Sequence, residues 1–172
     1  MKRTLATINL VILIFLATIN SIFIFGISKD KELSDFYFKN IELSESYLDI
    51  EVKHMHEVKA LVNAFLIITL VGLFIFLLSY KYSQVNFQIV GISLLSLAVL
   101  FIIALLFFES FFYKWHELFF VSDNWLLPEG AKLLQDYPSD YFKKKFILFD
   151  ALLAFFGIII LVGDKEFKKN SL

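Results

Sequence analysis

The 172-residue sequence contains no cysteine, two prolines and six glycines. The absence of cysteine excludes disulfides, thiolate metal sites and a cysteine nucleophile within this chain. A net charge of −1 offers no basic patch large enough to hold a phosphate backbone, so we predict no nucleic-acid partner. Charged residues are also scarce in four long stretches, and the mean hydropathy is +0.74. Apolar residues gathered into blocks in this way indicate an integral membrane protein.

Four apolar blocks are long enough to cross a bilayer as helices. A helix rises about 1.5 Å per residue, so about 20 residues cover a hydrocarbon core of about 30 Å. The first block resembles a signal peptide because Lys2 and Arg3 precede it, but its apolar run is about twice the usual length and no small-x-small cleavage site follows. We therefore predict an all-α membrane protein with a single domain over residues 1–172. Its four transmembrane helices are expected at about residues 5–27, 60–80, 87–108 and 146–162.

The distribution of positive charge predicts the orientation. Short segments on one side of the four blocks carry several basic residues, namely Lys2, Arg3, Lys81, Lys165, Lys168 and Lys169. The positive-inside rule places that side, and with it both termini, in the cytoplasm. The outer loops are then about residues 28–59 and 109–145, and we expect these two extracytoplasmic loops to form a small cap. The run Lys143–Lys145 opposes this orientation, since it lies on the outer side.

The two outer loops differ in composition. The first mixes apolar and charged residues without glycine or proline between residues 31 and 59, which favours short amphipathic elements at the surface. The second contains Pro128, Pro138 and Gly130, which are typical of turns. It also contains Trp115 and Trp125, a residue type that gathers at membrane interfaces.

Two histidines fall at the outer face of the predicted bundle. His54 shortly precedes the second block, and His116 follows the third block within about two helical turns. We expect this depth to match the ester groups of a lipid. A neutral imidazole takes up and returns a proton near pH 7, as acyl transfer requires. The alternative for each histidine is a structural role, with the ring satisfied by a neighbouring backbone or carboxylate group.

No protein nucleophile accompanies these histidines. The sequence has no G-x-S-x-G elbow, no H-E-x-x-H helix and no phosphate-binding glycine loop, and nothing distinguishes any serine of the second outer loop. His54, His56, Glu57 and Glu117 lack the spacing of a zinc site, so we predict neither a metal nor another cofactor. If the chain catalyses acyl transfer, the nucleophile belongs to the substrate.

Several stretches of the chain resemble one known family. They are His54-Met55-His56-Glu57-Val58-Lys59, Phe112-Tyr113-Lys114-Trp115-His116-Glu117-Leu118-Phe119-Phe120, Asp123-Asn124-Trp125-Leu126-Leu127-Pro128 and Tyr137-Pro138-Ser139-Asp140-Tyr141-Phe142. On these residues the chain resembles the DUF1461 family of four-span bacterial membrane proteins, which includes the lipoprotein intramolecular transacylases. The resemblance follows the order of the four blocks along the whole chain.

The resemblance implies a specific reaction. Such enzymes move the sn-2 acyl chain of the diacylglyceryl-cysteine at a lipoprotein N-terminus onto the α-amino group of that cysteine, giving the lyso-form lipoprotein. The histidines of the family's H-[ML]-x-D-V and F-H-x-x-F-F motifs correspond to His54 and His116, with Glu57 and Trp115 departing from the motif residues. The implied partners are a diacylated bacterial lipoprotein and membrane lipid. The implied location is the bacterial cytoplasmic membrane, with the active site at the outer leaflet.

These two lines of reasoning combine into a predicted mechanism. His116 acts as the general base toward the substrate amine and then protonates the departing glyceryl oxygen, while His54 donates a hydrogen bond to the oxyanion at the sn-2 carbonyl. His56 is the second choice for the first histidine, because two residues along a helix point to another side. Residues predicted to orient the histidines or to bind the substrate head are Glu117, Lys53, Asn124, Trp125 and Asp150, the last inside the fourth block and facing the bundle.

Two other functions compete with acyl transfer. A bis-histidine haem protein would need its ligands inside the spans, whereas these histidines lie at the membrane surface. A noncatalytic membrane partner or assembly subunit would use the outer aromatic residues for docking. The oligomeric state and the acyl-chain preference are left open by the sequence.

Overall fold

The computed structural model describes residues 2–28, 30–80 and 84–170, and these residues form helices without any strand. The elements are α1 (Lys2–Ile27), α2 (Lys31–Lys39), α3 (Asp49–Tyr80), α4 (Phe87–Leu106), α5 (Phe108–Phe119), the short 3₁₀ helix η1 (Asp123–Trp125), α6 (Lys132–Asp136) and α7 (Ser139–Asn170). Four of them, α1, α3, α4 and α7, are long and apolar enough to cross a membrane. The prediction of an all-α protein with four helices that are long and apolar enough to span a membrane is confirmed.

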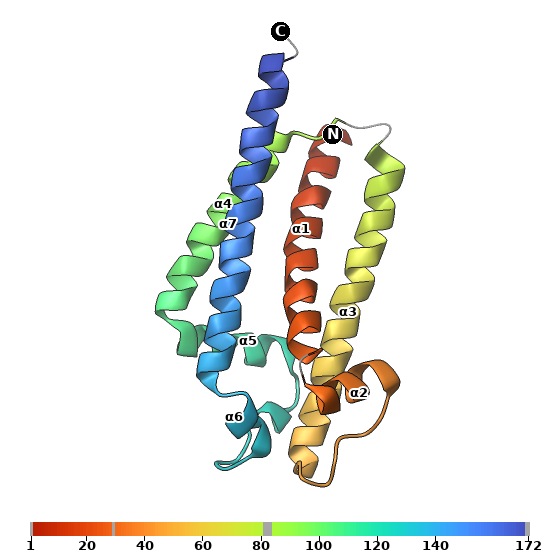
Figure 1. The fold of residues 1–172 in the computed structure, drawn as a ribbon, viewed down its shortest axis with the longest axis vertical. Coiled ribbons are helices and arrows are strands. Elements are labelled where there is room, and N and C mark those ends of the chain that lie inside the picture. The colour runs from red at the N-terminus through yellow and green to blue at the C-terminus, as the bar shows by residue number, and fades with distance from the viewer. Residues whose placement is uncertain (1, 29, 81–83, 171–172) are drawn as a thin grey trace.

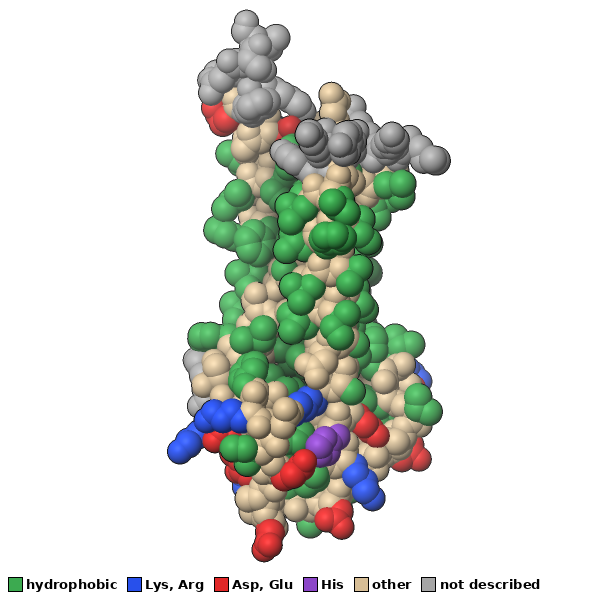
Figure 2. Space-filling model, turned by 90° about the vertical axis from the view of Figure 1, so that its right-hand side faces the viewer, with side chains coloured by type: hydrophobic (Ala, Val, Ile, Leu, Met, Phe, Trp, Pro, Cys, Tyr) green, Lys and Arg blue, Asp and Glu red, His purple; other side chains and the backbone are tan. Residues whose placement is uncertain are grey.

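The four long helices stand side by side, and the short elements gather at one end of the bundle (Figure 1). We call this end the cap, formed by residues 30–48 and 107–138. Helix α1 begins and α7 ends at the opposite end (Figure 1). Figure 2 shows charged side chains crowded on the cap and mostly hydrophobic side chains along the long helices. Which end faces the cytoplasm stays a prediction, and Lys81, one of the residues behind it, lies outside the described residues.

Helices α1, α3 and α7 extend beyond the predicted apolar blocks, whereas α4 ends two residues before the end of its block. Helix α3 begins at Asp49, so His54 lies within the helix and not in a loop before it. No glycine or proline interrupts the chain between Asp49 and the apolar block, and the helix can therefore continue into the cap. Helix α4 ends at Leu106, where Phe107 takes φ −119° and ψ 37°, and α5 starts in a new direction.

Helices α4 and α7 pack against each other most extensively among the described elements. Val90 and Leu94 of α4 and Leu153 of α7 are completely buried. Two glycines permit this approach, because a Cβ on Gly91 would lie 2.9 Å from the carbonyl oxygen of Gly157 and 2.5 Å from the Leu161 Cγ atom. Small residues allow membrane helices to approach closely in this way.

Gly91→Ala is therefore expected to destabilise the bundle by about 1–3 kcal/mol, the usual cost of overpacking. The measurement is the thermal unfolding midpoint of the purified protein in detergent, which should fall relative to the wild type. Gly163→Ala is the matched control, because a Cβ at Gly163 meets no atom within 4 Å. Equal midpoints for Gly91→Ala and Gly163→Ala would contradict the close packing of α4 on α7.

A buried carboxylate fixes the cap to α3. The Glu51 side chain is fully buried and accepts hydrogen bonds from two backbone amides, Leu48 N at 2.7 Å and Leu133 N at 2.6 Å. The first amide precedes α3, and the second belongs to the first turn of α6. One hydrophobic cluster also joins the two cap segments to α3, and its buried members include Leu33, Phe36, Leu43, Tyr47 and Leu133 of the cap and Met55 of α3. The cap is thus held against the part of α3 that contains the histidines.

Candidate functional site

His54 of α3 and His116 of α5 meet at the junction of the bundle and the cap. Their ring centroids are 6.0 Å apart, with an angle of 37° between the ring planes. His54 is buried, with 8% of its surface exposed, and His116 is partly buried. Helix α5 turns away from the axis of α4 at the cap end of the bundle (Figure 1). This turn allows His116 of α5 to contact His54 of α3.

Aromatic rings enclose the two histidines. The ring of His116 lies 4.3 Å from the ring of Phe112, 5.3 Å from that of Trp125 and 5.4 Å from that of Phe120, between centroids. Phe120 is buried and also contacts His54 edge-on at 4.9 Å. The predicted supporting residue Trp125 therefore lies directly against His116. These apolar surroundings lower the pKa of His116 by desolvation, because burial disfavours the charged imidazolium.

A backbone carbonyl determines the tautomer of His116. Its Nδ1 atom lies 2.7 Å from the carbonyl oxygen of Phe112, which can only accept a hydrogen bond. Nδ1 therefore carries the proton in the neutral ring, and Nε2 keeps a free lone pair. This bond raises the pKa of His116, but burial has the larger effect and lowers it. A neutral imidazole with Nε2 unprotonated is the form that a general base requires.

Glu57 connects His54 to the loop that follows α5. Its Oε1 atom accepts hydrogen bonds from Ser122 Oγ at 2.6 Å and from Asn124 Nδ2 at 2.8 Å. Its Oε2 atom lies 3.9 Å from Nδ1 of His54. Both of these facing atoms are buried and lack a hydrogen-bond partner within the described part of the chain. The carboxylate therefore holds the segment that carries Trp125 and is available to His54.

The other predicted site residues lie apart from the histidine pair. His56 pairs with Glu42 at 3.1 Å on another side of α3, and Glu117 pairs with Lys114 at 2.6 Å on the surface. Lys53 is exposed, whereas Asp150 is buried in α7 and its Oδ1 atom has no hydrogen-bond partner among the described residues. Across residues 2–28, 30–80 and 84–170, neither histidine forms a hydrogen bond, ion pair or ring contact with His56, Glu117, Lys53 or Asp150.

Sequence reasoning did not single out Glu57, Ser122, Phe112 and Phe120 as parts of this site. The sequence spacing indicates two of them. Glu57 follows His54 by three residues and Phe112 precedes His116 by four, which places each on the same helical face as its histidine. The contact of Ser122 with Glu57 joins positions 65 residues apart and depends on the path of the loop.

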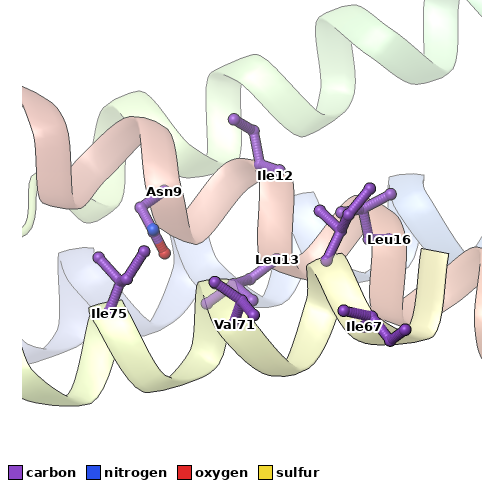
Figure 3. Close-up of a pocket in the computed structure, with 9 residues that line it drawn as sticks. Asn9, Ile12, Leu13, Leu16, Ile67, Val71 and Ile75 are labelled. Atoms are coloured by element: carbon purple, nitrogen blue, oxygen red, sulfur yellow. The ribbon is translucent and has the colours of Figure 1, made fainter. Parts of the chain in front are cut away.

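Among the described residues, no three His, Cys, Asp or Glu side chains are arranged to hold a metal ion. A groove of about 310 Å³ between α1 and α3 lies toward the end of the bundle away from the cap. Figure 3 shows that its labelled lining is aliphatic apart from Asn9.

The protein-family model of the lipoprotein intramolecular transacylase Lit matches the chain over residues 29–142. The match covers more than half of the chain and includes His54, His116 and the whole cap. No curated protein and no solved structure matches the chain.

Proposed function

The chain belongs to the lipoprotein intramolecular transacylase family, and we propose that it is a membrane acyltransferase acting on diacylated lipoproteins. It moves the sn-2 acyl chain of the N-terminal diacylglyceryl-cysteine to the α-amino group of that cysteine, which gives the lyso-form lipoprotein. The observation that carries this proposal is the meeting of His54 and His116, with ring centroids 6.0 Å apart, at the membrane end of the cap.

The proposed location is the bacterial cytoplasmic membrane, with the cap outside and both termini in the cytoplasm. The basic residues in the short segments of the sequence before the first, between the second and third, and after the fourth apolar block support this orientation through the positive-inside rule. The histidine pair then lies at the outer leaflet, at the depth of lipid ester groups.

In the proposed reaction the substrate supplies both reacting groups. The amine nitrogen attacks the sn-2 carbonyl carbon, a C–N bond forms, and the carbonyl electron pair moves to oxygen. His116 Nε2 accepts the proton of the amine. When the intermediate collapses, the bond between the acyl carbon and the glyceryl oxygen breaks, and His116 returns the proton to that oxygen. Holding amine and ester in one molecule supplies proximity worth about 7–11 kcal/mol in favourable cases.

His54 is proposed to stabilise the oxyanion of the intermediate through Nε2–H. When His54 carries a proton on both ring nitrogens, its Nδ1–H faces the Glu57 carboxylate and its Nε2–H remains available to the substrate oxygen. Burial disfavours the charged ring, and the Glu57 carboxylate beside Nδ1 offsets part of that cost. Glu57 thus acts as a positioning residue, because it orients His54 and does not itself contact the substrate.

We expect Glu57→Gln to slow acyl transfer by about tenfold, which corresponds to about 1.4 kcal/mol of transition-state stabilisation. Glutamine keeps an oxygen for Ser122 and Asn124 but removes the charge beside His54. The measurement is the initial rate of the purified enzyme in nanodiscs. Glu42→Gln is the control, since Glu42 pairs with His56. Similar rates for the two variants would contradict the role of Glu57.

The proposed base also predicts the pH dependence. The substrate amine, with a pKa of about 7.7–8.0, must be neutral to attack, so kcat/KM should rise with pH up to that range. His116 must be neutral as well, and burial lowers its pKa below the ordinary value. Protonation of His116 below about pH 6.5 should therefore lower kcat/KM further. Histidine-selective ¹⁵N NMR, assigned with His116→Gln, measures this titration, and a midpoint above 6.5 would contradict the description of the site.

The proposed reaction can be tested with purified protein in nanodiscs and a synthetic diacylglyceryl-cysteinyl peptide labelled in its sn-2 chain. Tandem mass spectrometry should locate the label on the cysteine nitrogen after incubation. A peptide with an acetylated amine is the control, because it lacks the nucleophile and should stay unchanged. Labelled chain that remains on glycerol in the free-amine peptide would reject the proposed function.

A further inference from the structure

A second groove lies between α1 and α7 and is separate from the histidine pair. It has a volume of about 210 Å³ and is lined by Ile14, Ala17, Thr18, Ser21, Leu152 and Phe156. The two hydroxyl groups in this lining donate to carbonyls of their own helix, Thr18 to Ile14 at 2.7 Å and Ser21 to Ala17 at 2.8 Å. With its polar groups satisfied internally, the groove suits a hydrocarbon chain.

A lysine lies beyond the cap end of this lining. On α7, Lys145 precedes Leu152 by seven residues and Phe156 by eleven, which is about two and about three turns along the same helical face. On α1, Phe25 continues the face of Ser21 by about one turn. The Lys145 Nζ atom lies 5.4 Å from the centroid of the Phe25 ring. A positive charge therefore stands where an acyl chain in the groove would reach its headgroup.

No described carboxylate neutralises this charge. Within the described residues, Lys145 forms cation–π contacts with Phe25 and Tyr141 and has no ion pair. Lys143 and Lys144 precede it, are exposed, and likewise lack an ion pair among those residues. Gly26 leaves room here, because a Cβ at that position would lie 3.0 Å from the Tyr141 hydroxyl. Lys143–Lys145 is also the lysine run that the positive-inside rule does not predict on the outer side.

We infer that the α1–α7 groove binds a phospholipid with an anionic headgroup, with its acyl chain along Ala17 and Leu152 and its phosphate at Lys145. Long lysine side chains reach headgroups from helix ends, and clustered lysines attract anionic lipid. The diacylglyceryl-cysteine substrate carries no phosphate, so Lys145 favours a lipid other than the substrate. A second copy of the chain is a less suitable occupant. A two-fold dimer along this groove would place two lysine runs together without carboxylates to compensate their charge. A lipid site would account for the presence of Lys143–Lys145 on the predicted outer side.

The test uses the full chain in phosphatidylcholine nanodiscs with a trace of lipid that is spin-labelled on its acyl chain, either phosphatidylglycerol or phosphatidylcholine. Electron paramagnetic resonance measures the motionally restricted fraction of each probe. The wild type should prefer phosphatidylglycerol by about fivefold, as one basic group at a membrane surface provides. Lys145→Gln should lose the preference and Lys145→Arg should keep it. Lys114→Gln is the control, because Lys114 is already paired with Glu117.

A second variant tests the groove itself. Ala17 is exposed on α1, so Ala17→Phe fills the groove without burying a new group in the bundle, and it should lower the restricted fraction of phosphatidylglycerol. Size-exclusion profiles and helical circular dichroism establish that each variant is folded. Equal binding of both probes by the wild type, an unchanged preference in Lys145→Gln, or full binding in Ala17→Phe would overturn the inference. Displacement of the probe by a diacylated lipopeptide would assign the groove to the substrate and overturn it too. The readout is lipid binding, so it does not depend on the proposed reaction.

Discussion

His116→Ala is expected to slow acyl transfer by about 10²–10⁴-fold, the usual contribution of a positioned general base. The variant loses the Nε2 lone pair that accepts the proton of the attacking amine, and with it the donor that protonates the glyceryl oxygen. The hydrogen bond between His116 Nδ1 and the Phe112 carbonyl, 2.7 Å long, also disappears, but this carbonyl lies within a helix. The measurement is the initial rate of label transfer to the cysteine nitrogen in nanodiscs.

The control for this experiment is Glu117→Ala. Glu117 is the next residue on α5, and its side chain pairs with Lys114 on the surface. Its replacement changes the same helix without changing the histidine pair, so its rate should stay within about threefold of the wild type, or 0.7 kcal/mol. A folded His116→Ala protein with a rate close to that of Glu117→Ala would show that His116 is not the base.

His54→Ala is expected to slow the reaction by about 10²–10³-fold, the cost of losing one oxyanion donor. His54→Gln should lose less, because a glutamine amide can still donate one N–H to the substrate oxygen. His56→Ala is the matched control, since His56 lies two residues away and pairs with Glu42 at 3.1 Å. Rates of all three variants are measured at saturating lipopeptide.

The pattern across these variants decides the roles of the histidines. A large loss in His56→Ala with a small loss in His54→Ala would assign the first histidine to His56 and contradict the site described above. If His54→Gln were as slow as His54→Ala while His116→Gln kept more activity than His116→Ala, the two roles would be exchanged, with His54 and Glu57 forming the base.

Much of the fold could be predicted from the sequence because a bilayer imposes a simple requirement. An apolar run of about 20 residues must become a helix in order to satisfy its backbone groups, and four such runs specify four helices. The ends of the helices were harder to predict. Polar residues at Asp49–Lys59 fit either a loop or a helical extension in water, and packing of this segment against the cap favours the helix.

Some features of the candidate site can likewise be predicted from the sequence, and others depend on the tertiary fold. The candidates His54 and His116 follow from two local features, namely their positions next to the apolar blocks and the family motifs that contain them. Their approach required the break at Phe107 and the new direction of α5, which no local pattern specified. The spacing of three residues predicts that Glu57 neighbours His54 on a helix, whereas its hydrogen bonds to Ser122 and Asn124 depend on how the loop folds. Residue type and position in the sequence alone point to Asp150 and Lys53, and their roles stay predictions.

The most direct measurement is mass spectrometry of lipoprotein N-termini from bacteria that lack other N-acylating enzymes and express this chain or its His116→Ala variant. Cells with the wild-type chain should contain lipoproteins with one acyl chain on the cysteine nitrogen and one on glycerol. Cells with the variant, at equal amounts of membrane protein, should keep both chains on glycerol. Lipoproteins that keep both chains on glycerol in the wild-type cells would contradict the proposed transacylase activity.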